Sequence, residues 1–134
     1  MEEDKYYFFL NPYNNRVFNK CPKCENPTNK KKLPISIELE EKKMFLNINK
    51  TCRFCAKCEL LIVKKQEIED MLSLAFHKNI SEKDYCIIGT IDEANYSEGA
   101  KDLKNSKFFE HLHLFKEKWN FEIMPKYVWV PNKK

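Results

Sequence analysis

Hydrophobic and polar residues alternate along part of the first half of the chain, in the way that is typical of β-strands. In LPISIEL, residues 33–39, every second residue is apolar, and MFLNIN, residues 44–49, repeats the pattern. Side chains spaced in this way point to one face of a strand. We therefore expect two antiparallel strands joined around Glu40–Lys43.

The first residues of the chain also favour strands. YYFFL at residues 6–10 and RVF at residues 16–18 flank NPYNN, whose asparagines and proline favour a turn. This arrangement predicts a short opening hairpin. Further along, LLIV at residues 60–63 is a continuous apolar run, which predicts a short buried strand.

From Lys65 the hydrophobic period changes from two residues to about 3.6, which indicates an amphipathic helix ending near Asn79. A second helix is expected in the C-terminal part, where apolar residues again recur at helical spacing. The residues that define its apolar face are Phe108, Phe109, Leu112, Phe115 and Trp119.

Between the two predicted helices, DYCIIGTID at residues 84–92 predicts a strand. A cysteine in an apolar strand usually serves as a small hydrophobic residue, and this is the interpretation for Cys86. Gly89 in the same strand indicates a bulge or a close approach of another backbone segment. YVWV at residues 127–130 predicts an edge strand that ends at Pro131.

The chain has 134 residues, of which 43% are hydrophobic and 13% aromatic, so it can bury a core as one compact domain. No apolar segment approaches the roughly 18 residues of a membrane span. The N-terminus MEEDKYYFFL is acidic, and its apolar run is too short for a signal peptide. We therefore expect a reducing, cytoplasmic setting, in which six cysteines are metal ligands or core thiols rather than disulfides.

The cysteines are spaced as metal ligands. Cys21 and Cys24 form one CxxC turn, and TCRFCAKCELLIV at residues 51–63 holds Cys52, Cys55 and Cys58. Two residues between cysteines in a tight turn direct both sulfurs at one centre, and two such turns complete a tetrahedral zinc site. The second segment therefore contains one thiol more than the site requires.

The residues around each pair favour one choice. CPKCE at residues 21–25 and CAKCE at residues 55–59 agree at four of five positions, whereas CRFCA agrees only in its cysteines. The predicted ligands are therefore Cys21, Cys24, Cys55 and Cys58, with Cys52 as an alternative ligand. As a spare thiol, Cys52 is either packed beside the site or oxidisable with a pKa lowered by Arg53 and the metal.

This pattern resembles the zinc-ribbon family, in which two knuckles at strand ends grip one structural zinc, and it resembles small uncharacterised bacterial zinc-ribbon proteins. The resemblance covers about residues 16–63 and implies an antiparallel ribbon with one structural Zn²⁺, but no activity. Ribbons often carry glycine after the second cysteine of a knuckle, whereas this chain has glutamate at both positions.

Two other classes remain open as alternatives. The run Cys52–Cys58 is similar to an iron–sulfur motif but lacks its fourth cysteine and proline, so a redox or iron–sulfur protein is one alternative. With only Gly89 and Gly99, the chain has no glycine-rich phosphate loop, and it has no serine-hydrolase or zinc-protease motif. We expect no catalytic residue, although an enzyme with a site in the C-terminal half is the other alternative.

Positive charge is concentrated in the cysteine-bearing half of the chain. The net charge is +4, and residues 1–64 contribute +5 from 13 basic and 8 acidic residues, while residues 65–134 contribute −1 from 11 and 12. A positive surface around the knuckles would attract phosphate backbones. The candidate nucleic-acid-binding residues are Lys20, Lys23, Lys30, Lys31, Lys32, Lys50, Arg53, Phe54 and Lys57.

The expected fold class is α+β, with an N-terminal antiparallel zinc ribbon (residues 1–64) packed against a small α/β half (residues 65–134) that contains two helices, as one integrated domain. The expected function is that of a structural-zinc interaction module, an adaptor or accessory subunit. Its partner is a protein or a nucleic acid, with RNA or single strands favoured among nucleic acids. We expect no membrane association, and no small-molecule substrate is identified.

Overall fold

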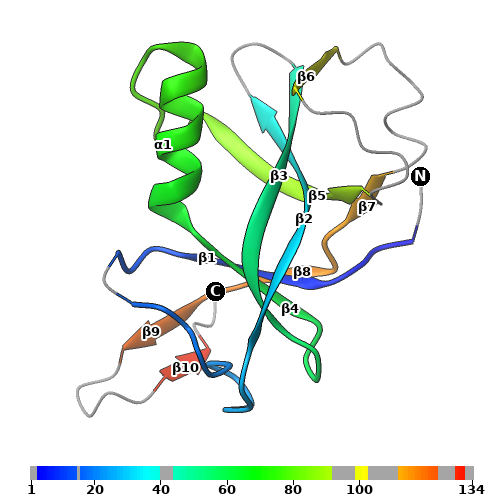
Figure 1. Cartoon of the computed structure of the whole chain (residues 1–134), viewed down its shortest axis with the longest axis vertical. Helices are drawn as coiled ribbons and strands as arrows, with labels where there is room; N and C mark the ends of the chain where they lie inside the picture. Colours follow the sequence, from blue (N-terminus) through cyan, green and yellow to red (C-terminus); the bar gives the residue numbers. More distant parts are fainter. Residues whose placement is uncertain are drawn as a thin grey trace.

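A computed structural model describes residues 3–14, 16–39, 44–91, 99–102, 112–123 and 129–131 of the chain. These residues form ten strands and one helix, α1 (Lys65–Phe76), shown in Figure 1. The strands are β1 (Tyr7–Asn11), β2 (Asn29–Leu39), β3 (Met44–Cys55), β4 (Leu60–Lys64), β5 (Tyr85–Ile91), β6 (Gly99–Asp102), β7 (Leu112–Leu114), β8 (Glu117–Trp119), β9 (Phe121–Ile123) and β10 (Trp129–Pro131).

One curled, mixed sheet dominates the described part of the chain. Its strands follow the order β7-β5-β2-β3-β4-β1-β8, and β6 pairs with β3 beside this path. Strand β1 runs parallel to both of its neighbours, β4 and β8, whereas the other described pairs are antiparallel. Strands β9 and β10 form a separate two-stranded sheet at the lower end of the molecule in Figure 1.

The antiparallel pair expected at residues 33–39 and 44–49 is confirmed. Ile35 of β2 lies opposite Ile48 of β3, and Ile37 lies opposite Leu46. All four side chains are buried and belong to the main hydrophobic cluster, so the alternating apolar residues form the core face of the hairpin. The strands are longer than the pattern predicted, because their polar ends carry the chain to the two cysteine turns.

The first predicted helix is also confirmed. Ile68 and Leu72 of α1 are fully buried and join the core formed by β2 and β3. The helix ends at Phe76, before the predicted end near Asn79, because His77 adopts a left-handed conformation with φ of 55° and donates its backbone N–H to the Ser73 carbonyl. This is a common way for a helix to terminate.

The second predicted helix is wrong where the structure can test it. Leu112 lies in β7 and Trp119 lies in β8, while Phe108 and Phe109 are outside the described residues. Strands β5 and β1 each have an edge that needs a pairing partner, and β7 and β8 supply the backbone hydrogen bonds. Pairing with existing strands thus prevails over the helical spacing of the aromatic residues, and the described fold is mostly β with one helix.

The predicted opening hairpin is also wrong. Strand β1 does not pair with the segment 16–18, which is not a strand, but lies between β4 and β8. Phe8 and Phe9 are both buried, as expected for a strand covered on its two faces. Phe18 instead packs its ring edge-on against Phe9, with centroids 5.3 Å apart.

The sheet includes strands from both segments that the sequence analysis separated at residue 64. Strand β5 pairs with β2, and β8 pairs with β1. Among the described residues there is no helix with the length and apolar character needed to cross a membrane.

Candidate metal centre

The first cysteine turn lies in the loop between β1 and β2. A bridge between Lys20 and Pro27 brings the ends of the loop together. Within it, the Cys21 N–H donates to the Asn26 carbonyl at 2.8 Å, and the Glu25 N–H donates to the Cys21 carbonyl at 2.9 Å. These bonds fix the backbone around CPKC, so the two thiols on it have defined directions.

The second turn connects β3 to β4 and has a similar internal contact. The Cys58 N–H donates to the Cys55 Sγ at 3.5 Å, as the Lys23 N–H donates to the Cys21 Sγ at 3.4 Å. Backbone N–H groups directed at a sulfur stabilise its negative charge. The two turns, defined here as knuckle 1 (residues 21–25) and knuckle 2 (residues 55–59), therefore each direct a backbone N–H at their first sulfur.

The glutamate after each knuckle occupies a backbone conformation that favours glycine. Glu25 has φ of 63° and Glu59 has φ of 54°, both in the left-handed region. A side chain at such a position costs roughly 1–2 kcal/mol relative to the ordinary helical conformation. Both knuckles thus adopt at this position a conformation that glycine favours, with a glutamate in its place, and the rest of the fold offsets the strain.

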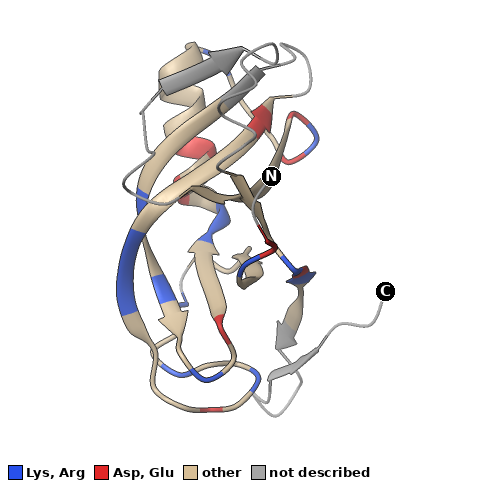
Figure 2. Ribbon diagram, turned by 90° about the vertical axis from the view of Figure 1, so that its right-hand side faces the viewer, with Lys and Arg blue, Asp and Glu red and all other residues tan. Residues whose placement is uncertain are grey.

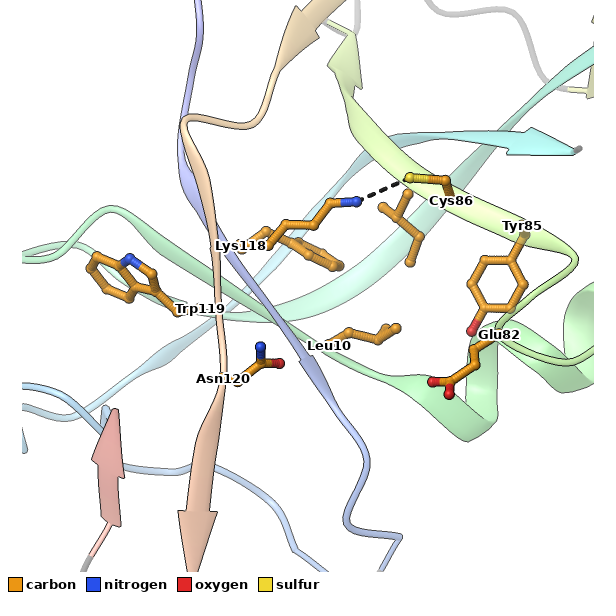
Figure 3. A pocket seen from close by; sticks show the side chains of 9 residues that line it. Leu10, Glu82, Tyr85, Cys86, Lys118, Trp119 and Asn120 are labelled. Atoms are coloured by element: carbon orange, nitrogen blue, oxygen red, sulfur yellow. Dashed lines mark hydrogen bonds between the residues drawn. The ribbon is translucent and has the colours of Figure 1, made fainter. Parts of the chain in front are cut away.

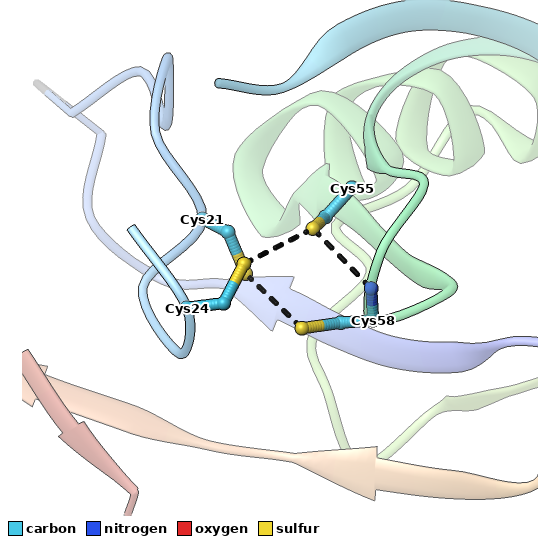
Figure 4. Close-up of side chains that lie close together, drawn as sticks. All are labelled: Cys21, Cys24, Cys55 and Cys58. Carbon is cyan, nitrogen blue, oxygen red and sulfur yellow. Dashed lines mark hydrogen bonds between the residues drawn. The ribbon is translucent and has the colours of Figure 1, made fainter. Parts of the chain in front are cut away.

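The two knuckles bring four thiols together, as Figure 4 shows. All four Sγ atoms lie within 4.8 Å of one another, with 3.4 Å between Cys24 and Cys55 and 3.9 Å between Cys21 and Cys58. Sulfurs bound to one zinc at about 2.3 Å in a tetrahedron lie about 3.8 Å apart. A disulfide would need about 2.05 Å, and all four cysteines are free. The group can therefore hold one metal ion.

The pKa values of these thiols show that they do not ionise independently. Burial raises the pKa of Cys21, and burial together with the neighbouring thiols raises that of Cys58. Burial also opposes ionisation of Cys24, but hydrogen bonds from the Asn26 backbone and from the other thiols lower its pKa to about 6. One thiolate is favoured and further ones are opposed, which is the electrostatic situation that a bound cation relieves.

The cluster is closed on its inner side by a hydrophobic group. Cys21 and Cys55 are 1% and 0% exposed, whereas Cys24 and Cys58 are partly exposed. The apolar residues packed around them are Phe9, Phe18, Leu60, Ile62 and Phe121. An ion bound by four thiolates in this setting would have no free coordination position, which is typical of structural rather than catalytic zinc.

A contact that the sequence analysis missed joins knuckle 1 to the C-terminal strands. The Lys23 ammonium lies 4.0 Å from the ring centroid of Trp119, and the Tyr7 ring stacks on Trp119 with centroids 4.3 Å apart. Trp119 had been assigned to the apolar face of a helix. The signal that could have located it is the alternation of apolar and polar residues in WNFEI, residues 119–123.

Cys52 lies outside the cluster. Its side chain is 3% exposed and packs in the main core, and its thiol donates to the Lys50 carbonyl at 3.5 Å. Burial raises the pKa of Cys52 to about 12, so the suggestion of a lowered pKa next to Arg53 is wrong. Because successive strand residues point to opposite faces, Cys52 points to the core face of β3, opposite to Arg53.

Some of the candidate nucleic-acid-binding residues already have partners within the chain. Lys50 forms an ion pair with Glu67 at 2.6 Å. Arg53 donates to the Thr28 hydroxyl at 3.0 Å and to the Thr28 carbonyl at 2.7 Å, and so connects β3 to the segment between knuckle 1 and β2. Their charges contribute to the local potential, but their hydrogen-bonding groups are partly used.

Two further candidates lie on the core face of the hairpin. Phe54 packs edge-on against Tyr6, with centroids 5.6 Å apart, and the Lys31 ammonium lies 5.1 Å from the centre of the Phe54 ring. Both contacts restrict access to the ring. Phe54 therefore offers less surface for stacking than its position beside Arg53 suggested.

The remaining candidates are exposed lysines on or near the knuckles. Lys20 precedes knuckle 1 and Lys57 lies within knuckle 2, while Lys30 and Lys32 project from the same face of β2 because they are two residues apart. In Figure 2, basic segments follow the β2–β3 hairpin and continue into the loops at its lower end. No ion pair occupies these four ammonium groups among the residues that the structure describes.

A scan against protein-family models, a search of curated proteins and a search of solved structures each gave no match for this chain. The likeness to zinc ribbons therefore rests on the two knuckles and their four thiols.

Proposed function

We propose that the protein is a structural-zinc binding module that holds one Zn²⁺ with Cys21, Cys24, Cys55 and Cys58. The observation that supports zinc is the approach of four thiols within 4.8 Å, two from each of two CxxC turns. Thiolate ligands favour zinc, copper(I) and iron–sulfur centres over hard cations such as Mg²⁺ and Ca²⁺. Four sulfurs in one tetrahedral group bind zinc without any change of redox state.

The proposed role of the zinc is mechanical. The four ligands come from the β1–β2 loop and the β3–β4 turn, which are separated by the whole β2–β3 hairpin. Joining the two knuckles fixes the loop of knuckle 1 against the sheet. Structural zinc contributes roughly 10–16 kcal/mol in small zinc-finger peptides, most of it as folding free energy.

We further propose that the ligand of the module is the phosphate backbone of RNA or single-stranded nucleic acid. The support is the position of Lys20, Lys30, Lys32 and Lys57, all exposed around the knuckles. Lysine provides a point charge and does not read bases in the bidentate manner of arginine. Binding should therefore depend strongly on salt and only weakly on sequence.

Metal analysis tests the first part of the proposal. The full chain, expressed with a removable tag, is purified without added metal and measured by inductively coupled plasma mass spectrometry. We expect one zinc per chain, and Cys21→Ser or Cys58→Ser should reduce it to a small fraction. Stoichiometric iron with sulfide and a visible absorption band would contradict zinc and support the redox alternative, and absence of any metal after zinc titration would refute the site.

Binding to labelled single-stranded RNA at several salt concentrations tests the second part. Four phosphate contacts on a single strand predict a slope of about −3 for log affinity against log salt. The double variant Lys30→Glu/Lys32→Glu should weaken binding and reduce the steepness of this slope by about half. Equal affinity of the variant and the native chain at low salt would refute the nucleic-acid proposal.

A matched control separates the knuckle surface from net charge. Lys78 and Lys83 are exposed near the end of α1 and the start of β5, at the end of the molecule opposite the knuckles in Figure 1. The variant Lys78→Glu/Lys83→Glu changes the net charge by the same amount as the test variant. It should retain most of the affinity, because exposed charges further apart than about 10 Å are largely screened at 0.1 M salt.

A further inference from the structure

A cavity of about 260 Å³ lies where β5 faces β8, as Figure 3 shows. These strands are near opposite ends of the sheet order, and the curl of the sheet brings them together. The segment after β7 links them, since the Phe115 N–H donates to the Ile88 carbonyl at 3.1 Å. We call this space the seam cavity. The residues that line it are Phe8, Leu10, Glu82, Tyr85, Cys86, Ile87, Lys118, Trp119 and Asn120.

The seam cavity has an apolar wall and a polar end, as ligand sites commonly do. Phe8 and Leu10 contribute apolar surface from β1. At the polar end, the Lys118 ammonium lies 3.1 Å from the Cys86 Sγ. The thiol therefore faces a cation across the seam, on strands that are far apart in the sequence.

The other charged and hydroxyl groups of the cavity have partners outside it. Glu82 pairs with Lys65 at 3.1 Å, and the Tyr85 hydroxyl donates to Glu69 at 2.9 Å. Lys118 has no carboxylate within 4.0 Å among the residues that the structure describes. Its positive charge is thus available to an anionic group that enters the seam cavity.

Cys86 also differs from the other five cysteines in access. Four of them share the metal centre, and Cys52 is 3% exposed in the core with its pKa raised by burial to about 12. Cys86 is partly exposed and opens to the seam cavity. A small molecule that enters the seam cavity can therefore reach the Cys86 sulfur.

We propose that Cys86 and Lys118 form a modification site, at which a small disulfide that carries a carboxylate attaches to Cys86 as a mixed disulfide. The Cys86 sulfur attacks one sulfur of the incoming disulfide, forms a new S–S bond and displaces the other half as a thiolate. The proton of the Cys86 thiol passes to this thiolate through solvent. Cys86 is oxidised, the leaving half is reduced, and the disulfide itself is the oxidant.

In this proposal the seam cavity selects the reagent. The Lys118 ammonium contacts the carboxylate of the retained half, and the wall formed by Phe8 and Leu10 accommodates its carbon atoms. A disulfide that carries ammonium groups but no carboxylate lacks this attraction and is repelled by the Lys118 ammonium. The preference between the two reagents is therefore the property that the lysine controls.

The experiment exposes the native full chain to cystine and, separately, to cystamine, and follows adducts at each cysteine by peptide mapping with mass spectrometry. We expect cystine to modify Cys86 well before Cys52, and Cys86→Ser to abolish that adduct. The comparison with Cys52 does not depend on the metal centre. Adducts that form on Cys52 as fast as on Cys86 would overturn the proposal.

Variants of Lys118 test the role of the charge. In Lys118→Met the ratio of the cystine rate to the cystamine rate at Cys86 should fall about two- to five-fold, the range for an exposed charge pair. Lys118→Arg should keep the ratio close to that of the native chain. The ratio cancels any general change in the reactivity of the thiol, so an unchanged ratio in Lys118→Met would refute selection by the lysine. Circular dichroism checks that both variants fold.

Discussion

Gly89 gives the most direct test of how closely strand β7 packs against β5. It lies in β5 opposite Leu114 of β7, and a Cβ atom built at this position would lie 2.1 Å from the His113 carbonyl oxygen and 2.9 Å from the carbonyl carbon. Both atoms belong to backbone and cannot rotate away. Because an ordinary contact needs about 3.4 Å, Gly89→Ala must displace β7 from β5 by roughly 1 Å or more.

The cost follows from what this displacement breaks. Strand β7 pairs with β5 at three positions, and Leu112 on β7 is 1% exposed. Partial exposure of a leucine costs up to about 1.5–3 kcal/mol, and each lost backbone hydrogen bond adds about 1 kcal/mol. We expect Gly89→Ala to reduce the free energy of unfolding by about 2–4 kcal/mol.

Urea unfolding followed by circular dichroism measures this change. Thr51→Ala is the control, because Thr51 is an exposed residue of β3 and its replacement should cost less than about 1 kcal/mol. Hydrogen exchange should also become faster in β7 and at residues 89–91 of β5 in the Gly89→Ala chain. A loss below about 1 kcal/mol with unchanged exchange in β7 would show that the close approach of the two backbones is not required.

Three further predictions concern single side chains. The Cys52→Ser chain should keep its bound metal while the Cys58→Ser chain loses it, measured as metal per chain. The free energy of unfolding of Cys52→Ser should fall by about 1–3 kcal/mol, because the serine hydroxyl would be buried in the core. Burial and the nearby Glu69 raise the pKa of Tyr85, so the neutral phenol favours the folded state. This stability is present below about pH 10 and declines as the pH rises further, so the free energy of unfolding should fall less in Tyr85→Phe than in the native chain, as urea unfolding at pH 8–10.5 would show. Glu25→Gly should raise the unfolding free energy by about 0.5–1 kcal/mol in thermal unfolding, because it removes the left-handed strain at φ of 63°.

The sequence correctly predicted the features that depend on residues close together in the chain. The two CxxC turns and the alternating residues of the β2–β3 hairpin each identify a short segment by its own chemistry. The choice of Cys55 and Cys58 over Cys52 came from comparing the residues around each cysteine, and these are the cysteines that the structure brings together with Cys21 and Cys24. That comparison worked because similar turns need similar residues.

The errors arose where long-range pairing decides the structure. The parallel pairing of β1 with β4 and β8 joins residues that are more than 50 positions apart, so no hairpin signal marks it. The aromatic residues of the C-terminal part have helical spacing, yet Leu112 and Trp119 lie in strands that complete the two edges of the curled sheet. The seam cavity could not be predicted either, because it exists only when β5 and β8 meet.

Trp119 connects the two sites that the fold creates. Its ring lies under the Lys23 ammonium of knuckle 1, while the adjacent residue Lys118 extends from the other side of β8 toward Cys86 at the seam cavity. A metal ion that fixes knuckle 1 would therefore also hold Lys23 against Trp119 and limit the movement of β8. Lys118 and Trp119 are consecutive residues of β8. Because the contact of Lys23 with Trp119 supports β8, it also supports the position of the Lys118 ammonium beside Cys86.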